Sequence, residues 1–192
     1  MNVAILIGSV RKNRQSHSAA YYVAYTLEKR GYDTELVDLA KTPLPILGRP
    51  GESDPQWETN INKIGKKLDA ADALIVLTPE YHGSLSGVLK NAIDHYWKEF
   101  QKKPVGVVAA SAGKMAGINA STQLQHVILS LGAYPLPLKL LIPDIQNAFD
   151  DEFEPQNEKI AANTDKFLDE FLWFVDAIVD KKMKESKEER AA

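Results

Sequence analysis

The stretch ALIVLTPEYHGSLSG, residues 73–87, decides the fold of this chain. It opens with an unbroken aliphatic run from Ala73 to Leu77, which is typical of a strand covered on both faces by other layers. Pro79 and Gly83 then interrupt regular structure, and an apolar pattern at helical spacing begins near Ser86. A buried strand, a turn rich in polar and aromatic side chains, and a helix therefore follow one another.

The same alternation extends over most of the chain. We predict strands at Val3–Ile7, Thr34–Leu39, Ala73–Leu77, Val105–Ala110 and Leu136–Ile142. Helical patterns cover residues 16–31, 54–69, 86–96, 116–132 and 160–178, with Gly31 ending the first and Asp54-Pro55 starting the second. Strands that alternate with helices wind by right-handed crossovers, so we expect an α/β three-layer αβα sandwich around a five-stranded parallel sheet.

The composition bounds the function. A chain of 192 residues is about the size of one domain, so we expect a single domain over residues 1–182 and a charged, solvated tail over 183–192. Cysteine is absent, which excludes disulfides, thiolate metal sites and cysteine nucleophiles. The net charge of -3 gives no basic field for nucleic acid, and no apolar stretch is long enough for membrane insertion. With no signal peptide in the sequence, we expect a cytoplasmic protein.

Ligands of open parallel sheets bind at the carboxyl ends of the strands, where the strand order reverses. In the order 2-1-3-4-5, the loops after strands one, three and four meet there. The first loop, GSVRKNRQSHS at residues 8–18, offers serine hydroxyls, Arg11 and a helix N-terminus, which together suit a phosphate. It matches neither a Walker loop nor a dinucleotide fingerprint. The alternative is a polar turn in which Ser16 or Ser18 is an ordinary helix N-cap.

The other two loops offer flat and small residues. Tyr81 and His82 could support a planar ligand; the alternatives are a buried tyrosine and a surface histidine, and for His82 taken singly the surface histidine is the favoured interpretation. SAGKMAG at residues 111–117 lets a ligand approach the main chain, and Lys114 could place positive charge near it. The acidic loop over residues 143–157 is interpreted as a solvated connection.

Taken together, GSVR, PEYHGSLSGVLKNAID (79–94) and SAGKMAG resemble the NADPH-dependent FMN reductase family of flavodoxin-like quinone, azo and chromate reductases. The resemblance implies FMN as cofactor and NADPH or NADH as hydride donor. It also implies where FMN would bind: Ser9, Arg11, Ser16, His17 and Ser18 near the phosphate, Pro79, Glu80, Tyr81, His82 and Gly83 along the isoalloxazine, and Ser111, Ala112 and Gly113 near its edge. Family members often have Asn in place of His82 and Pro in place of Ser86.

The reaction implied by the resemblance is a ping-pong transfer from NAD(P)H through FMN to a small-molecule acceptor such as a quinone, azo compound, metal oxyanion or free flavin. No residue is assigned as catalytic acid or base, and no metal site is expected. Lys12 and Arg14 are candidates for the extra phosphate of NADPH. The family also implies a homodimer or homotetramer, for which Tyr96, Trp97 and Phe100 could supply contacts. A non-catalytic FMN-binding electron carrier or redox sensor is the alternative function.

Overall fold

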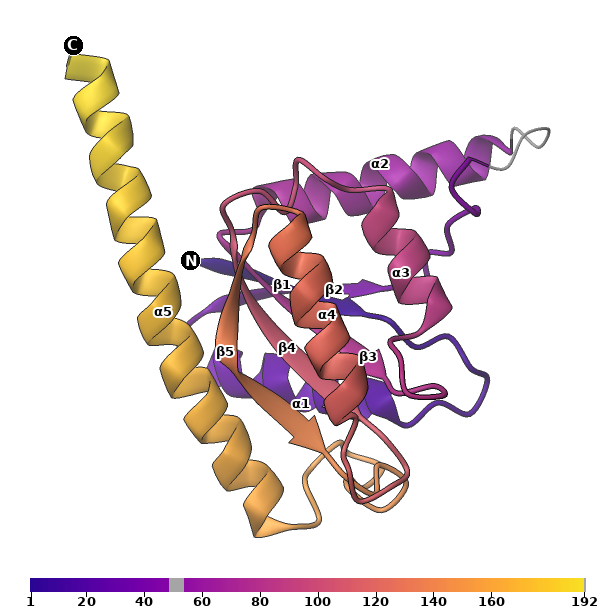
Figure 1. The fold of residues 1–192 in the computed structure, drawn as a ribbon. Helices are drawn as coiled ribbons and strands as arrows, with labels where there is room; N and C mark the ends of the chain where they lie inside the picture. Colours follow the sequence, from indigo (N-terminus) through magenta and orange to yellow (C-terminus); the bar gives the residue numbers. More distant parts are fainter. Residues whose placement is uncertain (49–53, 192) are drawn as a thin grey trace.

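The computed structural model describes residues 1–48 and 54–191, in which strands and helices alternate from end to end (Figure 1). In chain order the elements are β1 (Asn2–Ile7), α1 (Ser16–Lys29), β2 (Asp33–Asp38), α2 (Pro55–Ala70), β3 (Ala73–Pro79), α3 (Gly87–Asp94), β4 (Pro104–Ala110), α4 (Ile118–Ser130), β5 (Tyr134–Ile142) and α5 (Glu158–Ala191). The strands form one parallel sheet in the order β2-β1-β3-β4-β5. The predicted α/β sandwich and its strand order are confirmed.

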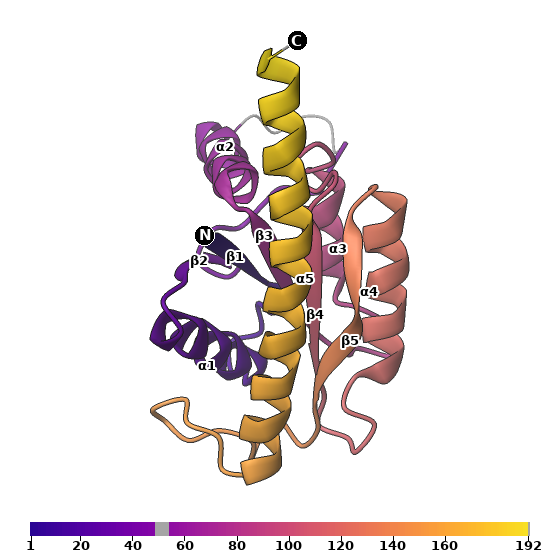
Figure 2. The same ribbon diagram turned by 90° about the vertical axis from the view of Figure 1, so that its left-hand side faces the viewer.

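Continuous aliphatic runs form the strands because both faces of the sheet are covered (Figure 2). In β1, Val3, Ile5 and Ile7 pack with residues of α1 and α5. Ala4 and Leu6 point to the opposite face and pack with residues of α2, α3 and α4. The sheet therefore separates two apolar cores, and no strand residue of β1 from Val3 onward faces water.

Helix boundaries follow local signals. Asp54 caps α2, since its carboxylate accepts a 2.8 Å hydrogen bond from the Gln56 amide, and Pro55 stands first in the helix. Gly31 follows the end of α1 with a φ of 84°, as predicted. The start of α1 differs from the N-cap alternative: the capping position is Gln15, which makes no side-chain cap bond, and both Ser16 and Ser18 lie inside the helix.

Most element ends lie within two residues of the prediction, and the ends of β3 and α5 are the differences that affect the site and the tail. Strand β3 continues two residues past Leu77, because Thr78 and Pro79 pair with Ala109 and Ala110 of β4. Helix α5 continues well past Ile178 and takes in residues 183–191 of the predicted charged tail; residue 192 lies outside the described residues. Both views show its C-terminal half projecting beyond the sheet (Figures 1 and 2).

In the described part of the chain, no helix combines the length and the apolar character needed to cross a lipid bilayer.

Candidate active site

The loop between β1 and α1 approaches the end of β3 closely. The Gly8 amide donates a 2.8 Å hydrogen bond to the carbonyl oxygen of Leu77. A Cβ at residue 8 would stand 2.7 Å from the Leu89 Cβ atom, so only glycine fits there. Ser9 and Ser16, at the two ends of the loop, are both buried. Their hydroxyls and the first backbone N–H groups of α1, which have no partner within the helix, are suited to an anion.

The turn after β3 is a tight two-residue hairpin. Tyr81 and Ser84 exchange backbone hydrogen bonds of 2.9 and 3.1 Å. The two residues between them, His82 and Gly83, have φ angles of 52° and 76°, which is the geometry of a primed hairpin turn. The hairpin leaves His82 exposed at its tip and presents Tyr81 at its base.

The ends of β4 and β5 are tied together. Ser111 donates its amide to the Ile142 carbonyl oxygen and accepts from the Ile145 amide, both at 3.1 Å. The Ser111 hydroxyl donates to the Gly113 carbonyl oxygen at 3.0 Å. The loop after β5 is thereby drawn up beside the loop after β4, so that four loops meet at the carboxyl edge of the sheet.

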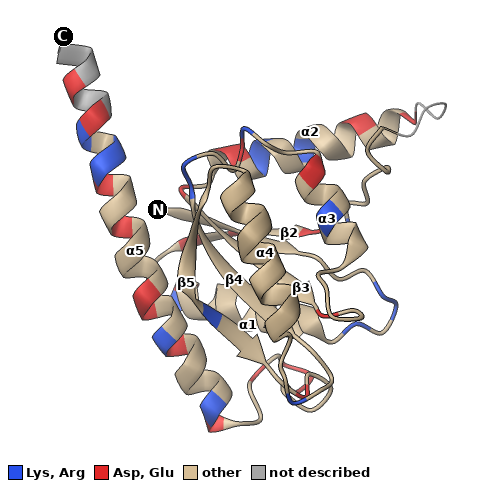
Figure 3. Cartoon of the chain, in the orientation of Figure 1, with Lys and Arg blue, Asp and Glu red and all other residues tan. Residues whose placement is uncertain are grey.

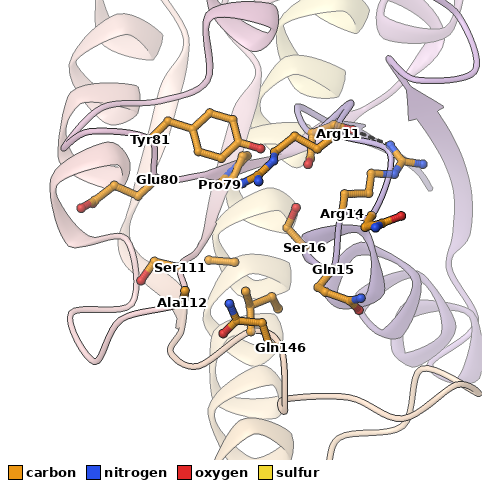
Figure 4. A pocket seen from close by; sticks show the side chains of 14 residues that line it. Arg11, Arg14, Gln15, Ser16, Pro79, Glu80, Tyr81, Ser111, Ala112 and Gln146 are labelled. Atoms are coloured by element: carbon orange, nitrogen blue, oxygen red, sulfur yellow. Dashed lines mark hydrogen bonds between the residues drawn. The ribbon is translucent and has the colours of Figure 1, made fainter.

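These loops enclose a cleft of about 220 Å³ (Figure 4). Arg11 and Tyr81 lie on one side of it, and Gln146 approaches from the opposite side. Eight of the predicted flavin-binding residues line this cleft: Ser9, Arg11, Ser16, Pro79, Glu80, Tyr81, Ser111 and Ala112. The structure thus brings the three predicted loops to one place.

The other predicted residues lie next to the cleft without lining it. His17 turns toward Tyr21 and Phe153, with ring centroids 5.6 and 5.8 Å away, and Ser18 is buried in α1. His82, Gly83 and Gly113 lie in the adjoining turns, and Lys114 is exposed. For His17 and His82 in particular, a side-chain contact with flavin stays a prediction.

Two arginines, Arg11 and Arg14, line the cleft, and only Arg14 is paired with a carboxylate of the described residues. The Arg11 guanidinium lies 5.7 Å from the centroid of the Tyr81 ring, and within residues 1–48 and 54–191 no carboxylate forms an ion pair with it. Arg14 instead makes a bidentate ion pair with Asp38. The structure therefore does not support the prediction that Arg14 binds the extra phosphate of NADPH; Lys12 is exposed, and its role stays a prediction.

Glu80 makes its contacts away from Arg11 (Figure 4). One carboxylate oxygen accepts hydrogen bonds of 3.0 Å from the backbone amides of Asn119 and Ala120. It caps the N-terminus of α4, a helix whose own capping residue is Gly117 and offers no side chain. Gln123 adds a second link, since it donates to the Gly83 carbonyl oxygen at 2.9 Å and accepts from the Ser84 hydroxyl at 2.7 Å.

The cleft also contains residues that the sequence did not predict. Asn13 and Gln15 lie within the predicted phosphate loop and could have been included on position alone. Ile145 and Gln146 come from the acidic loop interpreted as a solvated connection. This loop packs on α1, with the Phe153 ring stacked 4.8 Å from Tyr21 and Phe149 5.9 Å from Tyr22.

The chain is similar in sequence to a known protein family and to curated relatives. A family model described as NADPH-dependent FMN reductase matches residues 1–147, which include the three predicted loops. An FMN-dependent NADPH-azoreductase of Staphylococcus haemolyticus is 32% identical over 185 residues, covering 93% of this chain and 94% of that protein. The azoreductase of the same description from Staphylococcus saprophyticus is 30% identical over 183 residues, covering 91% and 95%.

Solved structures share the fold. FerB, a flavoenzyme NAD(P)H:(acceptor) oxidoreductase from Paracoccus denitrificans, superposes with a TM-score of 0.71 at 25% identity, covering 92% of this chain and 97% of that chain. A flavodoxin from the domain Archaea gives a TM-score of 0.61 at 10% identity, covering 93% and 99%. The second likeness shows the fold alone.

Proposed function

This chain belongs to the NADPH-dependent FMN reductase family and is an oxidoreductase that uses FMN with NAD(P)H, and we propose that it reduces small organic acceptors, azo compounds and quinones, by a ping-pong reaction. The observation that carries the proposal is the cleft itself, which has a cationic, hydroxyl-rich end at the start of α1 and a flat wall at Pro79 and Tyr81. The azo acceptor is suggested by the names of the staphylococcal relatives.

The residues of the cleft fit the cofactor. Arg11, the buried hydroxyls of Ser9 and Ser16 and the N-terminus of α1 supply donors for a phosphate dianion. Ser111, Ala112 and the backbone of the hairpin form small, polar walls that a heteroaromatic edge can approach. The chemistry that FMN would supply there is the acceptance of a hydride from NAD(P)H and the transfer of two electrons to the acceptor.

The protein contributes binding, orientation and access. Tyr81 and Pro79 support one face of a planar group, and the side of the cleft away from them is left for the donor and then the acceptor. Because both would use the same open side, we expect them to bind in turn. One NAD(P)H and one proton reduce a quinone, whereas splitting an azo bond into two amines takes two NAD(P)H and two protons.

The proposal extends to the location of the protein and to its oligomeric state. We propose a cytoplasmic location, where NAD(P)H is available, and a homodimer or homotetramer. Of the three aromatic residues predicted for contacts between protomers, Tyr96 and Phe100 are buried in the core, so only Trp97, 64% exposed, can serve. Light scattering of the wild type and of Trp97→Ala tests this: a monomeric wild type would contradict it.

Anaerobic stopped-flow reduction tests the function. The FMN-loaded protein is mixed with NADPH, then with an azo dye or a quinone, while flavin absorbance is followed. We expect bleaching and reoxidation, each at least as fast as steady-state turnover, and parallel double-reciprocal plots. Bound FMN that NADPH bleaches far more slowly than turnover would favour the electron carrier or sensor, and intersecting plots would overturn the ping-pong order.

A further inference from the structure

Arg14 joins three segments around the phosphate end of the cleft. Its Nη1 atom donates to the Ser9 carbonyl oxygen at 2.5 Å and to Asp38 Oδ1 at 2.6 Å, and its Nη2 atom donates to Asp38 Oδ2 at 2.5 Å. Asp38 is the last residue of β2 and also accepts from the Ala40 amide at 3.0 Å. One side chain therefore connects the start of the phosphate loop, its end and the neighbouring strand.

This pair is largely shielded from water. The Arg14 and Asp38 side chains are 11% and 5% exposed. Burial by itself raises the pKa of the Asp38 carboxyl, but the hydrogen bonds from Arg14 and from the Ala40 amide, with the Arg14 charge, hold that pKa below its usual range. The pair is therefore ionised at neutral pH, and the charge of Arg14 is balanced within the protein.

The loop needs such a restraint because it is long and its described backbone bonds are few. The loop runs from Gly8 to Gln15. Near its end, the Arg14 amide donates a 3.1 Å hydrogen bond to the Arg11 carbonyl oxygen and forms one turn. Gly8 is fixed at the other end, where its carbonyl oxygen accepts from the Ser86 hydroxyl at 2.5 Å. The Arg14 bond to the Ser9 carbonyl oxygen spans the segment between these two points.

We propose that Arg14 and Asp38 are positioning residues for the FMN phosphate, a role that rests on the function proposed above. Together they hold Ser9 and the N-terminus of α1 in a conformation in which their donors converge, while Arg11 supplies the unbalanced positive charge. Arg14 acts through the shape of the loop and not through its own charge on the phosphate. Asp38, on the far side of Arg14, is then as important for FMN binding as Arg14 itself.

Binding of FMN and of riboflavin, which lacks the phosphate, separates the possible roles. Dissociation constants are measured by fluorescence quenching for the wild type, Arg14→Met, Asp38→Asn and the double variant. We expect each single variant to weaken FMN at least tenfold and riboflavin less than threefold. The double variant is expected to bind FMN no more weakly than the weaker single variant, because both changes remove the same restraint.

Arg11→Met and Arg30→Met are the matched controls. Arg11→Met is expected to weaken FMN and also to reduce the salt dependence of binding, whereas the double variant of Arg14 and Asp38, which removes both members of a neutral pair, keeps the wild-type salt dependence. Arg30 pairs with Asp165 and Asp169 near the opposite end of α1, and its replacement should leave both ligands unaffected. If Arg14→Met does not fold, Arg14→Lys and Asp38→Asn carry the same comparison.

Three results would overturn the proposal. Asp38→Asn binding FMN as tightly as the wild type, with only Arg14→Met weakened, would mean that Arg14 contacts the phosphate by charge. Equal losses for FMN and riboflavin would mean that the pair only supports the fold. Unchanged FMN binding in both single variants would mean that the loop needs no such restraint. A wild type that binds neither ligand would instead refute the proposed function.

Discussion

His82 has a φ of 52° in a two-residue turn, a left-handed conformation that is uncommon for residues other than glycine. Asn-Gly is the pair that such a turn favours, and here the pair is His82-Gly83. The identity of residue 82 therefore bears first on the backbone. We expect His82→Asn to raise the free energy of unfolding by about 0.5 kcal/mol and the β-branched His82→Val to lower it by about 1–2 kcal/mol, measured by urea titration of the apoprotein. Equal stability of the two variants would show that the turn carries no strain.

His17 provides a pH dependence. Its Nδ1 atom is buried and has no hydrogen-bond partner among the described residues. Burial, and then the charge of Arg14, lower the pKa of this imidazole; Lys41 acts in the same direction and Asp38 in the opposite one. The folded protein therefore holds His17 neutral at a pH at which the unfolded chain, with a pKa of about 6.5, takes up a proton. Protonation favours unfolding, so this contribution to stability is present above that value and is lost as the pH falls below it.

We expect the wild type to lose stability between pH 7 and pH 5 and His17→Phe, which keeps an aromatic ring against Tyr21 and Phe153, to lose less. Urea unfolding at several pH values measures both curves, and the two proteins differ only at residue 17. Parallel curves for the two proteins would contradict the expectation.

At the scale of elements, side-chain hydrogen bonds from both partners connect the hairpin after β3 with helix α4. Glu80 caps α4 from the hairpin side, and Gln123 of α4 reaches back to the hairpin. We expect Glu80→Ala to lower the free energy of unfolding by about 1–2 kcal/mol, because two amides and the helix dipole lose their partner. Glu80→Gln, which keeps an acceptor oxygen, is the matched control and should lose less. Hydrogen exchange at Asn119 and Ala120 measures the cap directly, and unchanged protection in Glu80→Ala would rule it out.

The elements that could be predicted from the sequence are those whose conformation follows from the pattern of their own residues. The strands were predictable because two covered faces demand unbroken aliphatic runs, and the three loops because parallel strands bring their carboxyl ends to one edge. Gln146 was not predictable, since the loop that carries it has no periodic pattern and is placed by Phe149 and Phe153 packing on a helix distant in sequence. The position of Arg14 in the loop could be predicted, but its ion pair with Asp38 could not, because the two residues are far apart in the sequence and no sequence pattern connects them.

At the scale of the whole molecule, α5 is longer than the body that it covers. Its 34 residues span about 51 Å, well beyond the sheet (Figure 1). Phe167, Leu168, Phe171 and Val175 are buried against the sheet, and among the described side chains of α5 none beyond Val175 is buried. Lys and acidic residues are interspersed over the described part of this second half, as Figure 3 shows, and Lys181 and Glu185 form an ion pair along the helix. The fully buried contacts of α5 therefore lie in its first half, and Val179 adds a partly buried contact with the core.

A pair of truncations tests this division and the predicted boundary between a domain over residues 1–182 and a tail. We expect a chain that ends at Lys182 to unfold within about 0.5 kcal/mol of the full chain and to bind FMN with the same dissociation constant, because no buried side chain is lost. A chain that ends at Glu170 loses Phe171, Leu172 and Val175, whose burial is worth several kcal/mol in total, and should not fold. Urea unfolding followed by circular dichroism compares the chains. The division would be wrong if the chain that ends at Lys182 lost more than about 1 kcal/mol in its free energy of unfolding and also changed in molar mass by light scattering. That result would mean that the projecting half of α5 contacts a second copy of the chain and is part of the folded assembly.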